Sequence, residues 1–274
     1  MSFAEATVGK LILESGIDPF EARLLLGAVS GLGRTTLIAH PEAALDEAVA
    51  GAFRAIANRR RAGEPIAYLV GEREFYTLSL HVTPDVLIPR PETELLVDFA
   101  LEKLHAGGTL LDLGTGSGAI ALAVKHRRPD AQVAAVDRSH AALRVARANA
   151  ARLSLEVDFV AGNWFEQLDG RRFDLVVSNP PYVAEGDRHL TEGDLRFEPR
   201  GALTGGADGL DAIRCIARSA VSHLRPGGWL AIEHGLGQDA EVRALLQRAG
   251  LESVGSRPDL AGIARISIGT YNLE

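Results

Sequence analysis

The sequence of 274 residues contains a single cysteine, Cys215, so it cannot form an internal disulfide, which suits a reducing compartment. We expect Cys215 to be a small buried residue on a helix that runs from Ala212 to His223. The sequence also lacks any run of about 18 or more apolar residues, which excludes a membrane-spanning helix. Its first residues lack the basic and apolar segments of a secretory signal. We therefore expect a cytoplasmic enzyme with no membrane partner.

An excess of positive charge is missing as well, because 36 acidic residues outnumber 29 basic ones and the net charge is -7. Nonspecific binding to nucleic acid depends on clustered Lys and Arg, so we expect a protein substrate and no stable nucleic-acid partner. The one dense basic cluster, Arg59-Arg60-Arg61, ends an expected helix, where the helix dipole favours cations. Eight histidines show no metal-ligand spacing, and we expect no metal. No internal repeat or assembly element is recognisable, so we expect a monomer.

The most informative motif present is Asn179-Pro180-Pro181-Tyr182, which directly follows the apolar run 173–177. Such a run predicts a buried parallel strand, and open α/β sheets bind ligands outside the carboxyl ends of their strands. The Asn179 side-chain oxygen and the Pro180 carbonyl are two acceptors on a stiff turn, suited to holding a planar NH2 group. Tyr182 adds a flat wall. Asn-Pro-Pro is also a common turn sequence, so a second feature has to decide.

That second feature is an apolar strand, 110–113, that runs into the loop Gly114-Thr115-Gly116-Ser117-Gly118 and then into a helix over 119–127. Glycines allow the backbone to approach a ligand, and amides at the helix start supply donors. A strand over 133–136 then ends in Asp137, about 20 residues on, where an acid binds a ribose hydroxyl. These features predict a cofactor that contains a nucleoside.

The glycine spacing alone leaves the cofactor open, because Gly114, Gly116 and Ala119 also satisfy the dinucleotide fingerprint. Two features weigh against a nicotinamide enzyme. The loop lies well inside the chain after a separate N-terminal segment, and an amide-binding turn has no role in hydride transfer. S-adenosylmethionine fits better.

These motifs together resemble the S-adenosylmethionine-dependent methyltransferases that alkylate an exocyclic or amide nitrogen. More narrowly, the chain resembles the HemK/PrmC family, the peptide chain release factor glutamine methyltransferases, over nearly its whole length. The supporting stretches are Tyr68-Leu69-Val70-Gly71-Glu72-Arg73-Glu74-Phe75, Leu87-Ile88-Pro89-Arg90-Pro91-Glu92-Thr93-Glu94-Leu95-Leu96-Val97, Asn163-Trp164-Phe165 and Arg196-Phe197-Glu198-Pro199-Arg200.

The resemblance implies transfer of a methyl group from S-adenosylmethionine, leaving S-adenosylhomocysteine, to the side-chain amide nitrogen of the glutamine in the Gly-Gly-Gln loop of release factors in translation termination. It implies catalytic roles for Asn179 and Pro180, within a substrate-binding set of Asn179, Pro180, Pro181 and Tyr182. The implied cofactor-binding residues are Gly114, Thr115, Gly116, Ser117, Gly118, Asp137, Trp164 and Asn179. Two residues depart from the family pattern: Asn163 replaces a frequent acid, and Gly201 replaces a larger residue.

Three alternatives remain open. A glutamine methyltransferase acting on a ribosomal protein would have nearly the same active-site residues. An adenine amino-methyltransferase acting on nucleic acid shares the Asn-Pro-Pro-Tyr motif, because the exocyclic amine of adenine is also a planar NH2 group. A noncatalytic binding protein could retain the fold.

The order of elements predicts an α/β fold: a doubly wound, mostly parallel, seven-stranded Rossmann-like methyltransferase sheet with helices on both faces. A helical N-terminal substrate-recognition domain (1–70) and a β-hairpin linker (71–88) precede the methyltransferase domain (89–274). In the first domain, Ser2-x-x-Glu5 and Asp18-Pro19-x-Glu21 open helices, and a helix runs from Asp46 to Arg61. Apolar and polar residues alternate over 76–82, which predicts a half-buried strand that could form one arm of a hairpin. The sheet strands are expected at 109–112, 133–137, 157–160, 173–178, 229–233 and 264–268.

The segment 185–209 is long for an unstructured connection, and such loops often act as lids. We expect it to close over the protein substrate. Its residues Arg196, Glu198 and Arg200 either clamp the backbone of the target loop or pair with one another on the surface.

Overall fold

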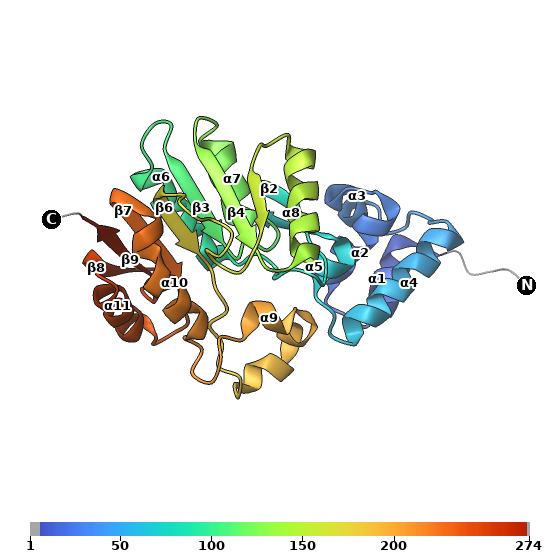
Figure 1. Cartoon of the computed structure of the whole chain (residues 1–274). Helices are drawn as coiled ribbons and strands as arrows, with labels where there is room; N and C mark the ends of the chain where they lie inside the picture. Colours follow the sequence, from blue (N-terminus) through green and yellow to red (C-terminus); the bar gives the residue numbers. More distant parts are fainter. Residues whose placement is uncertain (1–5, 273–274) are drawn as a thin grey trace, which may run out of the picture. The chain divides into compact units, whose positions relative to one another are not determined.

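The computed structural model describes residues 6–272, so the expected capping box of Ser2 and Glu5 lies outside the described residues. The chain divides into two compact units, Met1–Glu72 and Arg73–Glu274 (Figure 1). Each unit has its own hydrophobic core. Within the described residues, no helix has the length and apolar character needed to cross a membrane.

The first unit is helical and is built from α1 (Val8–Glu14), α2 (Pro19–Ser30), α3 (Arg34–Ala39), α4 (Glu47–Arg61) and α5 (Ile66–Val70). The expected start of α2 is confirmed, because the Asp18 side chain accepts hydrogen bonds from the backbone N–H groups of Phe20 and Glu21. Phe53 of α4 is buried in this core.

The basic cluster at the end of α4 is paired inside the same unit. Arg60 lies 2.8 Å from Glu21, and Arg59 donates to Glu64 at 2.7 Å. All three arginines lie in the last turn of α4, where the helix dipole favours cations. The ion pairs of Arg59 and Arg60 are an addition that the sequence analysis did not predict.

The boundary between the units falls in a two-stranded hairpin of β1 (Glu72–Phe75) and β2 (Leu78–His81). The predicted strand over 76–82 is wrong at its start, because Tyr76 and Thr77 form the turn, with φ of 47° and 71°. From Leu78 onward the predicted alternation is confirmed, since Leu78 and Leu80 are buried while Ser79 is exposed.

The second unit contains one seven-stranded sheet, as predicted, in the order β5-β4-β3-β6-β7-β9-β8. All neighbours from β5 to β7 run parallel, and β9 pairs antiparallel with β7 and with β8. The strands are β3 (Thr109–Leu113), β4 (Gln132–Asp137), β5 (Asp158–Ala161), β6 (Phe173–Ser178), β7 (Leu224–Glu233), β8 (Glu252–Pro258) and β9 (Ala264–Tyr271). No sequence signal predicted β8, because this edge strand has no buried apolar side chain to create an alternating pattern.

Helices cover both faces of this sheet (Figure 1). Alternate residues of each strand face opposite layers: Leu110 packs with α6 (Glu94–Lys103) and α7 (Ala119–Arg127), whereas Leu111 packs with α10 (Asp211–His223) and α11 (Asp239–Arg248). A short 3-10 helix, η1 (Pro91–Thr93), precedes α6, and α8 (His140–Leu153) packs near β4, β5 and β2. The predicted doubly wound architecture is confirmed.

The prediction for Cys215 is half right. The helix is present as α10, but Cys215 is exposed. Its neighbours Ile213, Ile216 and Ala217 form the buried stripe of α10, and residue 215 falls outside that stripe because successive helical residues are rotated by a fraction of a turn of about 3.6 residues.

The segment between β6 and α10 has short helices of its own: η2 (Arg188–Thr191), η3 (Gly193–Phe197) and α9 (Arg200–Leu203). The segment is therefore not an unstructured connection, and its action as a lid stays a prediction. Leu190 and Leu203 are buried, so the segment has local apolar anchors.

Candidate active site

Three loops meet at the carboxyl ends of β4, β3 and β6, which are neighbours in the sheet. Leu113 of β3 pairs with Val136 of β4 and with Ser178 of β6, so Gly114, Asp137 and Asn179 leave the sheet side by side. The chain adds β4 and β5 on one side of β3 and then crosses to add β6 and β7 on the other. Such a reversal opens a crevice where α/β sheets bind ligands.

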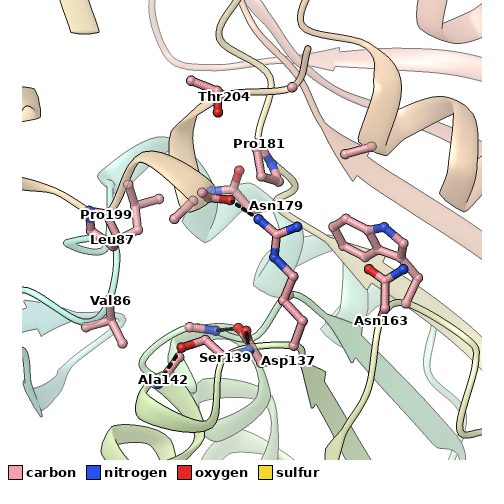
Figure 2. A pocket seen from close by; sticks show the side chains of 18 of the residues that line it. Val86, Leu87, Asp137, Ser139, Ala142, Asn163, Asn179, Pro181, Pro199 and Thr204 are labelled. Carbon is pink, nitrogen blue, oxygen red and sulfur yellow. Dashed lines mark hydrogen bonds between the residues drawn. The ribbon is translucent and has the colours of Figure 1, made fainter. Parts of the chain in front are cut away.

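A cavity of about 560 Å³ lies at this edge, within the range usual for small-molecule sites. In Figure 2, Asp137 and Asn179 lie on opposite sides of the cavity, with Leu87 and Pro199 together along a third side. The lining residues are Asp85, Val86, Leu87, Gly114, Gly116, Val136, Asp137, Arg138, Ser139, Ala142, Gly162, Asn163, Trp164, Asn179, Pro181, Pro199, Gly201, Ala202, Thr204, Gly205, Gly206, Asp211 and Ala212.

The glycine loop and Asp137 form one wall. Gly116 has φ of 56°, a conformation that favours glycine, and its N–H donates to Asp137 Oδ2 at 2.9 Å. Ser139 N–H donates to the other oxygen, Oδ1, at 2.8 Å. Each carboxylate oxygen keeps a further lone pair, so Asp137 can still accept from ligand hydroxyls.

Trp164 supplies a flat aromatic surface on the same wall. It has φ of 54°, and a Cβ added to Gly114 would lie 3.4 Å from Cζ3 of its ring. The neighbouring Asn163, which also lines the cavity, donates from Nδ2 to Glu166 at 2.9 Å. The predicted cofactor residues Gly114, Gly116, Asp137 and Trp164 thus share one cavity with Asn179.

The remaining predicted residues of the glycine loop do not line this cavity. Thr115 and Ser117 are buried, and the Thr115 hydroxyl donates to Asp112 at 2.6 Å. Gly118 is the N-cap residue of α7, with φ of 85°. The loop turns into the helix here, which directs these residues to the protein interior. Their contact with a cofactor stays a prediction.

Asp112 underlies the loop and is fully buried. Burial raises its pKa to about 7, against the opposing hydrogen bonds from the Thr115 hydroxyl and the Ala121 N–H. These two bonds join the strand end, the loop and the first turn of α7. Asp112 therefore has a structural role beneath the cavity.

Asn149 of α8 is a buried residue that the sequence analysis missed. Its side chain accepts from His81 N–H at 2.7 Å and donates to the carbonyls of His81 at 2.9 Å and Ser117 at 3.0 Å. It joins β2 to the glycine loop. The signal in the sequence was a polar residue within a stripe of buried apolar residues on α8.

On the opposite side, the orientation of Asn179 follows from a single hydrogen bond. Its Nδ2 donates to the Thr93 hydroxyl oxygen at 3.0 Å. Within residues 6–272, no protein donor reaches Asn179 Oδ1 or the Pro180 carbonyl. Pro181 lines the cavity, and Pro180 is buried. The Asn179 side-chain oxygen is thus unpaired beside the cavity, whereas Pro180 does not line it and its predicted contact with substrate stays a prediction.

Tyr182 is held at both its ring and its backbone. Its hydroxyl donates to Glu233 Oε1 at 3.1 Å, and its carbonyl accepts from Gln238 Nε2 at 3.1 Å. Burial raises the pKa of Tyr182, and the neighbouring Glu233 raises it further. Tyr182 does not line the cavity of Asp137, so its predicted contact with substrate stays a prediction.

Glu198 differs from the sequence expectation. It is only 3% exposed, accepts from Ile88 N–H at 3.0 Å, and pairs with the Arg90 guanidinium. It therefore pairs with neither Arg196 nor Arg200, because its side chain is directed inward against the segment 86–90. Burial raises the pKa of Glu198, and the charge of Arg90 opposes that shift.

The departure at Gly201 lies beside Arg138. Arg138, the residue after Asp137, donates from Nη2 to the Gly201 carbonyl at 3.2 Å. A Cβ at residue 201 would lie 2.8 Å from this nitrogen. The end of the flexible Arg138 side chain would therefore have to shift to admit a larger residue at position 201.

Known proteins match the chain along most of its length. Residues 10–71 match the model of the PrmC N-terminal domain, and residues 91–194 match the methyltransferase small domain. A release factor glutamine methyltransferase of Burkholderia pseudomallei is 52% identical over 273 residues, which cover 96% of each chain. Its counterpart from Bordetella pertussis is 53% identical over 262 residues, covering 94% of this chain and 97% of the relative.

Two solved structures share the fold. A methyltransferase from Pyrococcus furiosus has a TM-score of 0.58 and 20% identity, covering 80% of this chain and 99% of its own. A 16S rRNA methyltransferase from Thermus thermophilus, in complex with AdoMet and guanosine, has a TM-score of 0.56 and 21% identity. The match covers 73% of this chain and 50% of the Thermus chain. At these identities the likeness concerns the fold alone.

Proposed function

The chain belongs to the HemK/PrmC family of release factor glutamine methyltransferases, and from this we propose that it methylates the glutamine of the Gly-Gly-Gln loop of peptide chain release factors. The acceptor atom is the side-chain amide nitrogen. The observation that carries the proposal is the Asn179 carboxamide, whose nitrogen is held by Thr93 while its oxygen is left unpaired beside the cavity of Asp137.

The methyl donor is S-adenosylmethionine. The residues present fit this group, because Asp137 can accept from ribose hydroxyls, Trp164 offers a flat surface and the loop of Gly114 and Gly116 permits close approach. When bound, it supplies a methyl group on a positively charged sulfur. We assign these four residues and Asn179 to its pocket.

A primary amide is a weak nucleophile, because its nitrogen lone pair is delocalised into the carbonyl. Asn179 Oδ1 and the Pro180 carbonyl would each accept one hydrogen of the substrate NH2 group, which fixes the amide plane. The two oxygens also stabilise positive charge that develops on the nitrogen. The nitrogen becomes acidic once it is methylated, so its proton leaves afterwards and the site needs no strong base.

We further propose that residues 1–70 recognise the protein substrate, that 71–88 link the two domains and that 89–274 carry out methyl transfer. The negative net charge supports a protein substrate over nucleic acid. We propose a monomeric enzyme acting in the cytoplasm, where release factors function.

Incubation with radiolabelled methyl donor tests the substrate directly. Parallel samples contain a full-length release factor, the same factor with the Gly-Gly-Gln glutamine replaced by alanine, a ribosomal protein, and DNA. We expect label, and a mass increase of one methyl group on that glutamine, only with the unmodified release factor. Label on the ribosomal protein or on adenine would instead support one of the alternative methyltransferases.

A further inference from the structure

Gln238 stands at the start of α11, yet its side chain makes no capping hydrogen bond to that helix. An N-cap side chain usually accepts from the first turn of its own helix. Here Gln238 Oε1 accepts from Gly235 N–H at 2.8 Å, and Nε2 donates to the Tyr182 carbonyl at 3.1 Å. The side chain therefore bonds to the Asn-Pro-Pro-Tyr turn, although Gln238 does not line the cavity.

The partners of Gln238 fix the orientation of its carboxamide. A carboxamide has one acceptor oxygen and two N–H donors. Gly235 N–H can only donate, whereas the carbonyls of Tyr182 and Asp208, at 3.1 and 3.4 Å from Nε2, can only accept. Turning the carboxamide over would place donor against donor and acceptor against acceptor. Both of its N–H groups are thus directed at neighbouring loops.

The two carbonyls belong to segments that lie against each other. Tyr182 ends the Asn-Pro-Pro-Tyr turn, and Asp208 lies near the end of the 185–209 segment. Gly209, with φ of 79°, allows the close approach, because an added Cβ would lie 2.2 Å from the Tyr182 carbonyl oxygen and 2.9 Å from Gln238 Nε2. Gln238 therefore joins the turn to the end of this segment.

The end of the turn depends on Gln238 more than its start does. At the start, the sheet holds the backbone, because Ser178 of β6 pairs with Ile232 of β7, and the two prolines stiffen the middle. In the part of the chain that the structure describes, no other protein donor reaches the Tyr182 carbonyl. The end is thus held at the backbone by Gln238 and at the ring by Glu233.

We propose that Gln238 is a positioning residue that acts through the Tyr182 carbonyl to hold the turn, and with it Asn179 Oδ1, in place for the substrate amide. Loss of this bond frees the end of the turn to move, and a displacement of about 1 Å can cost about 10²-fold in rate. This inference rests on the proposed function, since it concerns the placement of the acceptor for the substrate NH2 group.

The test compares three variants of the full-length chain with wild type: Gln238→Leu, Gln238→Glu and Gln247→Glu. Leucine removes every hydrogen bond of the carboxamide, so we expect Gln238→Leu to lower kcat about 10- to 100-fold at neutral pH. Affinity for S-adenosylmethionine, measured by calorimetry, stays at the wild-type value. Gln247→Glu is the matched control, because Gln247 is exposed on the same helix, and its kcat should equal that of wild type at each pH.

The pH dependence of Gln238→Glu separates positioning from a general structural role. The ionised carboxylate still accepts from Gly235 N–H but has no donor for the Tyr182 carbonyl. The carbonyl oxygens of Tyr182 and Asp208 disfavour its charge, which raises its pKa above the ordinary value of about 4.3. Once protonated, the carboxyl group donates to the Tyr182 carbonyl. The ratio of variant to wild-type kcat should therefore rise at least about threefold as the pH falls from about 8 to about 5.5.

The other ionisable groups around this position are common to both chains, so their titration cancels in the ratio. They are Glu233, His234, and the ion pairs of Asp208 with Arg214 and of Asp239 with Arg243.

Wild-type kcat in Gln238→Leu, or a kcat ratio for Gln238→Glu that does not change with pH, would overturn the inference. Thermal unfolding at each pH reports the folding of the variants, and the ratio for Gln238→Glu decides the matter if Gln238→Leu does not fold. Failure of the proposed function looks different. In that case the wild-type chain itself would place no methyl group on the release factor.

Discussion

At the scale of the residue, Asn179 has the clearest predicted effect. Asn179→Ala removes one of the two acceptors for the substrate amide, so we expect kcat to fall by about 10²-fold, as when one oriented group is deleted from an oxyanion site. The variant should bind S-adenosylmethionine, because the wall formed by Asp137 and Trp164 is intact. Single-turnover methylation of the release factor measures the loss. Full turnover with normal cofactor binding would show that Asn179 has no catalytic role.

Glu233 predicts the pH dependence of the same step. Burial raises its pKa to about 7, Glu92 raises it further, and the Thr93 and Tyr182 hydroxyls and Arg265 lower it. The carboxyl group therefore takes up a proton as the pH falls through about 7, whereas an ordinary glutamate stays ionised there. Protonation weakens the acceptor for the Tyr182 hydroxyl, which helps to hold the Asn-Pro-Pro-Tyr turn, so we expect kcat at saturating substrates to decrease toward acid pH.

The control for this prediction is Glu233→Gln, which has no titratable group at the position. Its kcat should be low, and it should not decrease further as the pH falls through about 7. If kcat of Glu233→Gln still decreased toward acid pH with the same midpoint as wild type, the titrating group would be another residue.

At the scale of the element, the 185–209 segment is joined to the 86–90 segment by the buried Glu198 carboxylate, which accepts from Ile88 N–H and pairs with the half-buried Arg90. Val86, Leu87 and Pro199 from these two segments line the cavity. Removing the Glu198 carboxylate leaves the Ile88 N–H without its acceptor and the half-buried Arg90 without its partner, at a cost of about 1–3 kcal/mol. The segment should therefore open more often in Glu198→Ala.

We expect Glu198→Ala to raise the rate of cleavage by a nonspecific protease within 185–209, and to speed the release of S-adenosylmethionine, by at least about tenfold. Glu192→Ala provides the matched control, since Glu192 is exposed on the same segment. If the segment is a lid, release factor and cofactor together protect it in the wild-type chain. Cleavage at the same rate in both variants would show that the buried pair does not hold the segment.

At the scale of the whole molecule, the two units have separate cores and the cavity is lined only by residues between 85 and 212. A chain of residues 73–274 should therefore bind S-adenosylmethionine with wild-type affinity. Without the proposed recognition domain, its kcat/KM for full-length release factor should fall by about tenfold or more, equivalent to losing at least ~1.4 kcal/mol of binding free energy.

A short peptide that contains Gly-Gly-Gln is the control substrate, because it offers no surface for a recognition domain. Both chains should methylate it at equal rates. Equal kcat/KM for the full-length factor would instead assign substrate recognition to residues 73–274 alone.

Much of this molecule was predictable because its signals are local. The apolar runs before Gly114, Asp137 and Asn179 predicted strands, and the glycine spacing predicted the loop. The observed order of the strands in the sheet then places all three at one edge. Predictions were wrong where a local pattern did not reveal the partner. Tyr76 continues an apolar alternation yet forms a turn, and Cys215 lies on a predicted helix but outside its buried stripe.

The sequence by itself therefore determined the sheet, its glycine loop and the Asn-Pro-Pro-Tyr turn, because each depends on the backbone preferences of adjacent residues. Only the tertiary structure decided which side chains support them. Thr93 meets Asn179 across 86 positions, Glu198 meets Ile88 across 110, and Asn149 meets His81 across 68. Hydrogen bonds act over about 3 Å, and no periodicity in a sequence records which distant residues the fold brings within that distance.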